Sequence, residues 1–183
     1  MKITRLRSPK DKRAAAALMA ASDPWFQLGL REEHCLKTFG APFRETWAAR
    51  EKGEIAGFVV ITMCGTFRGY IQVLFVSPAW RGRGLGEGLM AFAEKKIFAR
   101  SPNVFLCVSS FNKGAIRFYR RLGYGKAGLI KDFFKKGSDE ILMRKTVGPL
   151  RSFVTREKKH VKDQDLVPRR GRGSNRLAAP AAD

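Results

Sequence analysis

The chain has few of the residues that build metal centres or disulfide frameworks. It has only two histidines and three cysteines, Cys35, Cys64 and Cys107. The cysteines are odd in number and none forms a Cys-x-x-Cys pair, which argues against a disulfide framework and against a zinc site. We therefore expect no metal cofactor and a reducing, cytoplasmic environment.

Long hydrophobic runs are also lacking. The longest apolar stretch covers residues 55–64, which is far shorter than the roughly 20 residues needed to cross a bilayer. The first residues, Met-Lys-Ile-Thr-Arg-Leu-Arg, contain no apolar segment typical of a secretory signal. We therefore expect no membrane span.

Acidic residues are scarce: 16 Asp and Glu stand against 36 Lys and Arg, a formal net charge of +20. This excess predicts an anionic partner, which would be a polyphosphate cofactor, nucleic acid, an acidic protein or a membrane surface. The alternative is that the basic side chains only solvate the surface. Composition changes near Val147, so we expect one domain over residues 1–146 and a basic, largely disordered extension over 147–183.

Apolar periodicity and turn residues predict a mixed α/β fold in the order β-α-α-β-β-β-α-β-α-β-β. Strands are expected over residues 3–6, 43–50, 54–63, 70–76, 104–108, 124–134 and 140–145. Helices are expected over residues 9–21, 25–39, 85–97 and 113–122. The two strands joined by the helix that begins at residue 85 should be parallel neighbours in the sheet.

The most informative segment is Arg81-Gly82-Arg83-Gly84-Leu85-Gly86, where a predicted strand turns into a predicted helix. Glycines lack a Cβ, so the backbone can pass close to a ligand. The start of the helix offers unpaired N–H groups and the positive end of its dipole. With the charge of Arg81 and Arg83, the segment predicts an anion site, and a pyrophosphate is the best candidate.

Three glycine-loop chemistries compete for this segment. A phosphate-binding NTPase loop is excluded, because no Lys-Ser or Lys-Thr follows the glycines. A dinucleotide-binding loop is disfavoured, because Glu87 stands in place of the third glycine and the run follows a meander rather than a first strand. The third pattern, R/Q-x-x-G-x-G/A, is matched.

Together with two further segments, this run resembles the GNAT superfamily of N-acetyltransferases. Residues 112–124 follow the pattern N-x-x-A-x-x-x-Y-x-x-L-G-Y, and residues 139–145 are similar to the last strand of the family. The resemblance covers about residues 1–146 and is nearest to the branch that acetylates ribosomal-protein N-termini. It implies a GNAT-like, mostly antiparallel sheet with a splayed parallel strand pair. It also implies direct transfer of an acetyl group from acetyl-CoA to a primary amine in a ternary complex.

The resemblance also assigns roles to individual residues. Tyr119 would protonate the departing CoA thiolate, although a buried core tyrosine is the alternative. Asn112 would cap a helix and contact the pantetheine arm. A backbone N–H near Val76 would stabilise the oxyanion. The residues expected to bind acetyl-CoA are Leu74, Phe75, Val76, Arg81, Gly82, Arg83, Gly84, Leu85, Gly86 and Asn112.

The general base is missing from the two positions where the resemblance expects a carboxylate, which hold Tyr70 and Cys107. Gln72, expected on the same strand face as Tyr70 and Leu74, could only hold a water. An ordered water is therefore one alternative, and Cys107 as an acyl-carrying nucleophile, rather than a buried structural cysteine, is another. Remote candidates for the base are Glu32, Glu33, His34 and Glu45.

The sequence does not identify the acceptor amine. Positive charge disfavours polyamines and aminoglycosides, and favours an acidic or neutral acceptor, a protein N-terminus, or a lysine on a nucleic-acid-bound protein. A different class of function is a non-catalytic acyl-CoA-binding or nucleic-acid-associated module that keeps the fold, motivated by the missing carboxylate and the Arg-Gly tail. The oligomeric state is open, with a dimer as one option.

Overall fold

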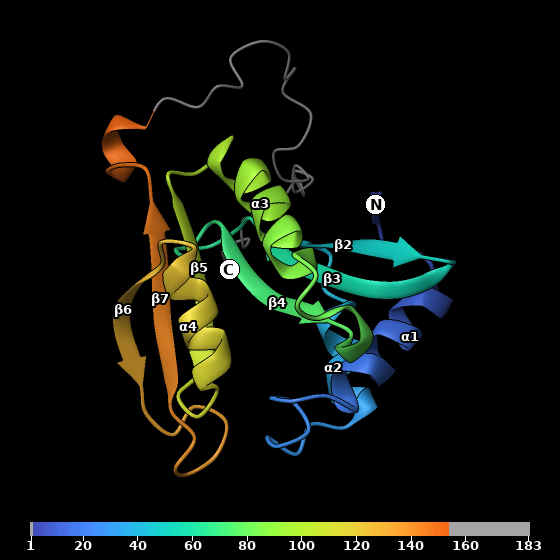
Figure 1. Ribbon diagram of the computed structural model, residues 1–183. Helices are drawn as coiled ribbons and strands as arrows, with labels where there is room; N and C mark the ends of the chain where they lie inside the picture. Colours follow the sequence, from blue (N-terminus) through green and yellow to red (C-terminus); the bar gives the residue numbers. More distant parts are fainter. Residues whose placement is uncertain (1, 154–183) are drawn as a thin grey trace, which may run out of the picture.

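A computed structural model describes residues 2–153 of the chain (Figure 1). Its helices and strands, in chain order, are β1 Ile3–Arg5, α1 Pro9–Ala20, α2 Glu32–Thr38, β2 Arg44–Glu51, β3 Glu54–Thr62, β4 Tyr70–Val76, α3 Leu85–Phe98, β5 Asn103–Ser109, α4 Lys113–Arg121, β6 Gly125–Ile130 and β7 Glu140–Thr146. The predicted element order is confirmed. Most of the predicted basic extension lies outside the described residues, so the domain boundary near residue 146 stays a prediction.

The strands form one seven-stranded sheet in the order β1-β2-β3-β4-β5-β7-β6. Neighbouring strands are antiparallel except β4 and β5, which are parallel and joined by the crossover helix α3. The parallel pairing is confined to Tyr70 with Phe105 and Ile71 with Leu106. Beyond these residues the two strands diverge, and Figure 1 shows the sheet opening between them. The predicted mixed sheet with a splayed parallel pair is confirmed.

Two hydrophobic cores hold the helices on opposite faces of the sheet. Helices α3 and α4 pack on one face, where Leu89 and Ile116 join Leu106 of β5. Helices α1 and α2 pack on the other face, where Met19 and Phe58 belong to the second core. Among the described residues, the second core contains none from β5, β6 or β7. This half of the sheet is therefore left without a helical cover, on the face where a substrate can approach.

Strand β4 contains a bulge that changes which side chains face which core. Val60 pairs with Val73 but Ile61 pairs with Ile71, so Gln72 is the extra residue. As a result Ile71 belongs to the core under α3, whereas Val73 belongs to the core under α1 and α2. The expectation that Tyr70, Gln72 and Leu74 share one face is wrong, because the extra residue reverses the alternation between Tyr70 and Leu74.

Two segments depart from the predicted secondary structure, and both surround the opening between β4 and β5. The predicted helix over residues 25–39 is shortened to α2, and a series of turns replaces its first part. Gly29, with a φ of 75°, interrupts the helix there. The predicted strand over residues 124–134 ends as β6 at Ile130, where Asp132 takes a positive φ and its carboxylate accepts from the amide of Gly137. These turns form the rim of the opening between β4 and β5.

Candidate active site

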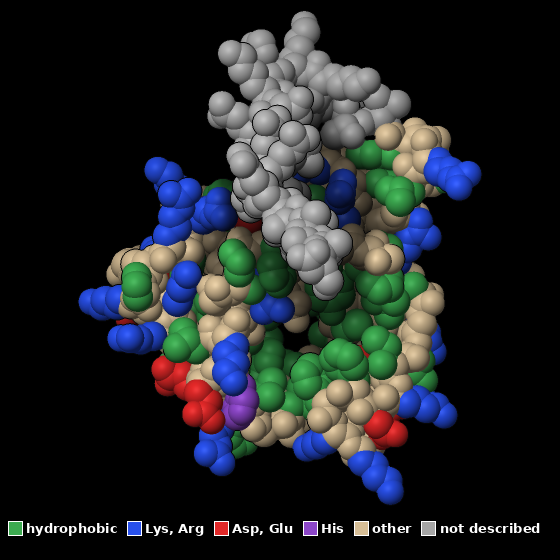
Figure 2. All heavy atoms as spheres, turned by 180° about the vertical axis from the view of Figure 1, so that it is seen from behind, with side chains coloured by type: hydrophobic (Ala, Val, Ile, Leu, Met, Phe, Trp, Pro, Cys, Tyr) green, Lys and Arg blue, Asp and Glu red, His purple; other side chains and the backbone are tan. Residues whose placement is uncertain are grey.

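A cavity of 1190 Å³ lies where β4 and β5 diverge. Its walls come from both strands, the starts of α3 and α4, the turn over residues 23–28, and Phe133 and Phe134 of the loop between β6 and β7. Seen from behind, Figure 2 shows a hollow lined by hydrophobic side chains, with lysine and arginine side chains around the outside of the molecule. The cavity therefore joins the glycine segment to the uncovered half of the sheet.

The three glycines of the predicted anion loop have two different tasks. Gly82 and Gly84 have φ values of 71° and 75°, which favour glycine, and Gly84 is the N-cap of α3. At Gly86, within α3, an added Cβ would lie 3.3 Å from Cζ of Phe118 in α4. All three line the cavity. The first two shape the turn at the helix start, and the third allows α4 to pack closely.

The two arginines of the loop lie in different places relative to the cavity. Arg81 lines the cavity, and its Nε donates to the carbonyl of Val76 at 3.2 Å, which ties the loop to the end of β4. The guanidinium of Arg83 instead lies 5.1 Å from the ring centroid of Trp80, and Arg83 is not among the lining residues. The structure brings Arg81 to the cavity and leaves Arg83 at its margin.

The end of β4 presents an open backbone edge to the cavity. Leu74, Phe75 and Val76 all line it, and none of them is paired with β5. On the opposite edge of β4, the amide of Ser77 donates to Ala56 of β3 at 2.9 Å. Because successive backbone groups of a strand alternate in direction, the N–H of Val76 points toward the cavity. This edge can bind an extended ligand that contains amide groups.

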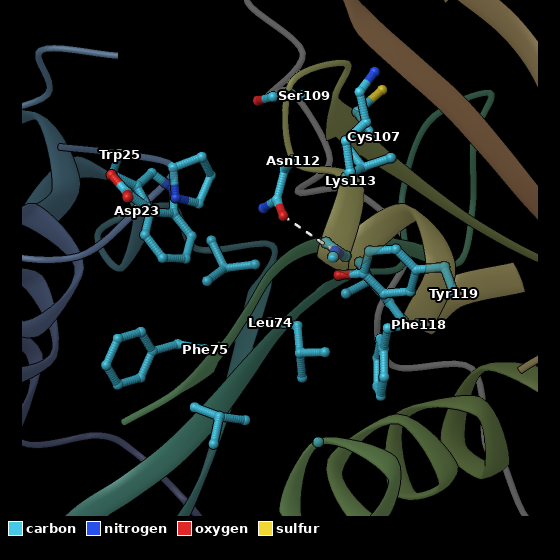
Figure 3. A pocket seen from close by; sticks show the side chains of 18 of the residues that line it. Asp23, Trp25, Leu74, Phe75, Cys107, Ser109, Asn112, Lys113, Phe118 and Tyr119 are labelled. Carbon is cyan, nitrogen blue, oxygen red and sulfur yellow. Dashed lines mark hydrogen bonds between the residues drawn. The ribbon is translucent and has the colours of Figure 1, made fainter. Parts of the chain in front are cut away.

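Helix α4 carries the other two predicted site residues, and both line the cavity. Asn112 caps the helix as predicted, and its Oδ1 accepts from the amide of Ala115 at 3.1 Å, the dashed bond in Figure 3. Tyr119 is 9% exposed, and its hydroxyl points into the space between Asn112 and Leu74 (Figure 3). Burial raises the pKa of Tyr119, so the phenol keeps its proton at neutral pH.

The remote candidates for a general base are not at the site, because none of the four lines the cavity: Glu32, Glu33, His34 and Glu45. His34 accepts from the backbone of Arg31 at 3.2 Å, and Glu45 accepts from the indole of Trp47 at 3.1 Å. Cys107 does line the cavity, but burial raises the pKa of its thiol. A protonated thiol is a poor nucleophile, which disfavours an acyl-cysteine intermediate.

Sequence reasoning missed a carboxylate in the cavity wall. Glu140, the first residue of β7, is 3% exposed and lines the cavity. The hydroxyl of Ser109 donates to its Oε1, and burial raises the pKa of the carboxyl. The only signal in the sequence was a glutamate at the start of the last strand, and the pairing of β7 with β5 was needed to place it. The aromatic rim residues Trp25, Phe133 and Phe134 were missed because they lie in turns that only the folded chain brings to the cavity.

Two further observations concern metals and membranes. Within residues 2–153, no cluster of three or more His, Cys, Asp or Glu side chains has the arrangement to hold a metal ion. No helix in that part of the chain has the length and apolar character to cross a membrane.

A glycine turn at a helix start, an open strand edge and a buried tyrosine all line this one cavity, an arrangement that suits a ligand with phosphate and amide groups. The chain belongs to the acetyltransferase (GNAT) family, whose family profile matches residues 12–124. It is an acetyl-CoA-dependent N-acetyltransferase, and the family predicted from the sequence is confirmed.

One curated relative and two solved structures are similar to this chain, and their names give different acceptors. The chain is 29% identical over 150 residues to the N-alpha-acetyltransferase RimI of Mycobacterium tuberculosis, covering 80% of this chain and 90% of that protein. The ribosomal-protein-S18-alanine N-acetyltransferase of Escherichia coli has a TM-score of 0.64 at 19% identity, covering 81% of this chain and 94% of that one. An aminoglycoside 6'-N-acetyltransferase complexed with coenzyme A has a TM-score of 0.65 at 20% identity, covering 81% and 98%. These two structures establish the fold alone.

Proposed function

We propose that the protein acetylates the α-amine at the N-terminus of a polypeptide, with acetyl-CoA as the donor. The observation that carries this proposal is the composition of the acceptor side of the cavity. Among residues 2–153 it is lined by five aromatic side chains and two carboxylates, Asp23 and Glu140, because Glu87 lies at the glycine loop and pairs with Arg121 at 3.6 Å. The aromatic residues are Trp25, Tyr70, Phe111, Phe133 and Phe134.

This composition suits a ligand with a single cationic group and an apolar body. A polyamine or an aminoglycoside carries several ammonium groups, and each would need a carboxylate or a polar partner on leaving water. A peptide N-terminus has one ammonium group, followed by amides and a first side chain that can pack on aromatic rings. Similarity to an N-alpha-acetyltransferase over 90% of that protein's length supports the same acceptor class.

On this proposal, the donor lies along the glycine loop and the open edge of β4. The pyrophosphate accepts from the amides of residues 82–86, where the dipole of α3 and the Arg81 side chain favour negative charge. The pantetheine amides pair with the backbone of Leu74, Phe75 and Val76. The side-chain amide of Asn112 contacts the same arm, and Arg83 contributes charge from the margin of the loop.

The thioester then lies beside the groups that the reaction needs. The N–H of Val76 points toward the cavity and stabilises the oxyanion that forms when the amine attacks the carbonyl carbon. Tyr119 donates its hydroxyl proton to the sulfur as the C–S bond breaks. Its raised pKa supports this role, because the phenol is fully protonated when the thiolate departs.

An acceptor panel tests the proposal. The full chain is incubated with acetyl-CoA and one of four amines: peptides with a free α-amine, the same peptides with a blocked α-amine and a free lysine, spermidine, or kanamycin. Released CoA is measured with a thiol reagent, and mass spectrometry locates the acetyl group. We expect transfer only to peptides with a free α-amine. Faster transfer to lysine, spermidine or kanamycin would contradict the proposal.

The remaining predictions from composition belong with this proposal. The net charge of +20 supports an anionic partner, nucleic acid or an acidic protein, that accompanies the polypeptide acceptor. A cytoplasmic location is supported by cysteine usage. The non-catalytic module loses its main motivation, since the missing carboxylate that prompted it has a counterpart in Glu140.

A further inference from the structure

Glu140 is a buried carboxylate for which the described part of the chain offers no cation. Its residue is 3% exposed, and no lysine, arginine or histidine among residues 2–153 forms an ion pair with it. The hydroxyl of Ser109 is the donor to its Oε1. Burying a carboxylate without a cation costs folding free energy, and one hydroxyl offsets only part of that cost. Because the side chain lines the cavity, a cationic ligand can supply the partner.

The sheet register brings Glu140 to the place where the proton must be removed. Glu140 of β7 is directly opposite Ser109 of β5, and Cys107 lies two residues earlier on the same face of β5. Tyr70 of β4 is the neighbour of Phe105, which is also on this face. Tyr70, Cys107 and Glu140 all line the same cavity. The pairing of β7 with β5 thus places the Glu140 carboxylate beside Cys107, which is one of the two positions where the family resemblance expected a carboxylate.

We infer that Glu140 is the base that takes a proton from the acceptor ammonium, and that Ser109 positions its carboxylate. The inference rests on the proposed function, because the acceptor's ammonium is the cation that the site lacks. The carboxylate takes one proton and leaves a neutral amine, which attacks the thioester and forms the C–N bond. When the C–S bond breaks, sulfur takes the Tyr119 proton. The second amine proton restores the phenol through solvent, and Glu140 releases its proton to water.

The surroundings of Glu140 favour this role over the other ionisable groups. Burial raises its pKa toward neutrality, which makes the carboxylate a stronger base, and the Ser109 bond opposes only part of that shift. Burial also raises the pKa of Tyr70 and of Cys107, so both stay neutral and neither competes as an anion. On the β6 side the facing residue is Ile130, which does not titrate.

The kinetic test replaces Glu140 with Gln, which keeps the shape and removes the base. For a peptide with a free α-amine, we expect turnover to fall about 100-fold or more with little change in acetyl-CoA affinity. With hydroxylamine, which is already neutral at the assay pH, the loss should be much smaller. In Ser109→Ala, the carboxylate loses its donor, so the acidic limb of the pH–rate profile should move to higher pH.

The stability test does not depend on the acceptor. The pKa of Glu140 is raised above its ordinary value of 4.5, so the folded state binds this proton more tightly than the unfolded chain. Stability therefore falls as pH rises from 4.5 through the raised pKa. At neutral pH, Glu140→Gln should raise Tm by about 2–4 °C for each kcal/mol of burial cost removed, and the gain should shrink as pH falls.

Glu94 provides the matched control. Its partly buried carboxylate accepts from Lys145 at 2.7 Å and does not line the cavity, so Glu94→Gln should lower Tm and leave turnover unchanged. A lower Tm for Glu140→Gln at every pH would show that Glu140 is a structural acceptor and overturn the inference. So would wild-type turnover by Glu140→Gln with the α-amine peptide. If the wild-type chain acetylates no peptide α-amine, the proposed function is wrong, and the inference that rests on it is wrong as well.

Discussion

The donor side and the acceptor side of the cavity are built in opposite ways. Apart from the Asn112 side chain, the donor side is one continuous segment, residues 74–86, that offers mainly backbone groups of β4, the glycine turn and the start of α3. The acceptor side is assembled from side chains of four distant segments: the turn over residues 23–28, β5 with the loop that follows it, the loop before β7, and the start of β7 at Glu140. Backbone contacts tolerate many side chains but depend on conformation. We therefore expect the donor side to be sensitive at its glycines and the acceptor side to be sensitive at its side chains.

Tyr119, where the two sides meet, should show the largest effect. Tyr119→Phe keeps the ring, which packs edge-on against Phe118 and Tyr124, and removes only the hydroxyl. We expect turnover to fall about 10²- to 10⁴-fold, because the thiolate then leaves without an acid. Acetyl-CoA affinity, measured by calorimetry, should change little.

Tyr124→Phe is the matched control for this change. Tyr124 is more deeply buried than Tyr119 and packs against it, but it does not line the cavity. Its variant should keep full turnover. Equal losses in turnover and in acetyl-CoA affinity for Tyr119→Phe would mean that the tyrosine has only a structural role.

The contrast between the two sides also explains what could be predicted from the sequence. The donor side follows from local rules: glycines at a strand-to-helix turn, and an asparagine that caps a helix seven residues before Tyr119. The element order and the parallel β4–β5 pair follow from the same periodicity and crossover rules. All of these depend on neighbours within a short stretch of chain.

The acceptor side could not be predicted because its geometry depends on long-range register. Glu140 reaches the cavity only because β7 pairs with β5, 31 residues away in sequence at the Ser109 contact. The bulge at Gln72 changes which face of the sheet the later side chains of β4 occupy, and no residue pattern in the strand predicts it. The late start of α2 at Glu32 likewise follows a left-handed residue, Gly29, within an otherwise helical pattern.

A glycine pair tests the conformational sensitivity of the donor side. Gly84 is the N-cap of α3 with a φ of 75°, and alanine there costs about 1–2 kcal/mol in a left-handed conformation. If binding of acetyl-CoA needs that turn, its affinity should fall by about tenfold for each 1.4 kcal/mol. Gly88→Ala is the matched control, since an added Cβ there meets nothing within 4 Å. It should stabilise α3 by about 0.5–1 kcal/mol and leave affinity unchanged.

The two arginines of the loop should differ in effect. Arg81 lines the cavity and bonds the end of β4, so Arg81→Gln should weaken acetyl-CoA binding by up to about tenfold, and less at high salt. Arg83 lies over Trp80 and is outside the cavity lining, so Arg83→Gln should have a smaller effect. Calorimetry at two salt concentrations measures both. A larger loss for Arg83→Gln would show that the loop rearranges around the pyrophosphate.

The smallest effect is expected at the aromatic rim of the acceptor side. Phe134 is 47% exposed and pairs with Phe133 at a centroid distance of 4.9 Å, so Phe134→Ala should leave Tm nearly unchanged. Loss of an aromatic contact worth about 0.5–1.5 kcal/mol should raise KM for the acceptor peptide about threefold to tenfold, without changing acetyl-CoA affinity. Phe43, which is 51% exposed and lies outside the cavity lining, is the matched control. If Phe43→Ala raises KM as much as Phe134→Ala does, the acceptor peptide does not contact Phe134. The acceptor side would then not extend to the aromatic rim, which would contradict the proposed contrast between a donor side built from backbone and an acceptor side built from side chains.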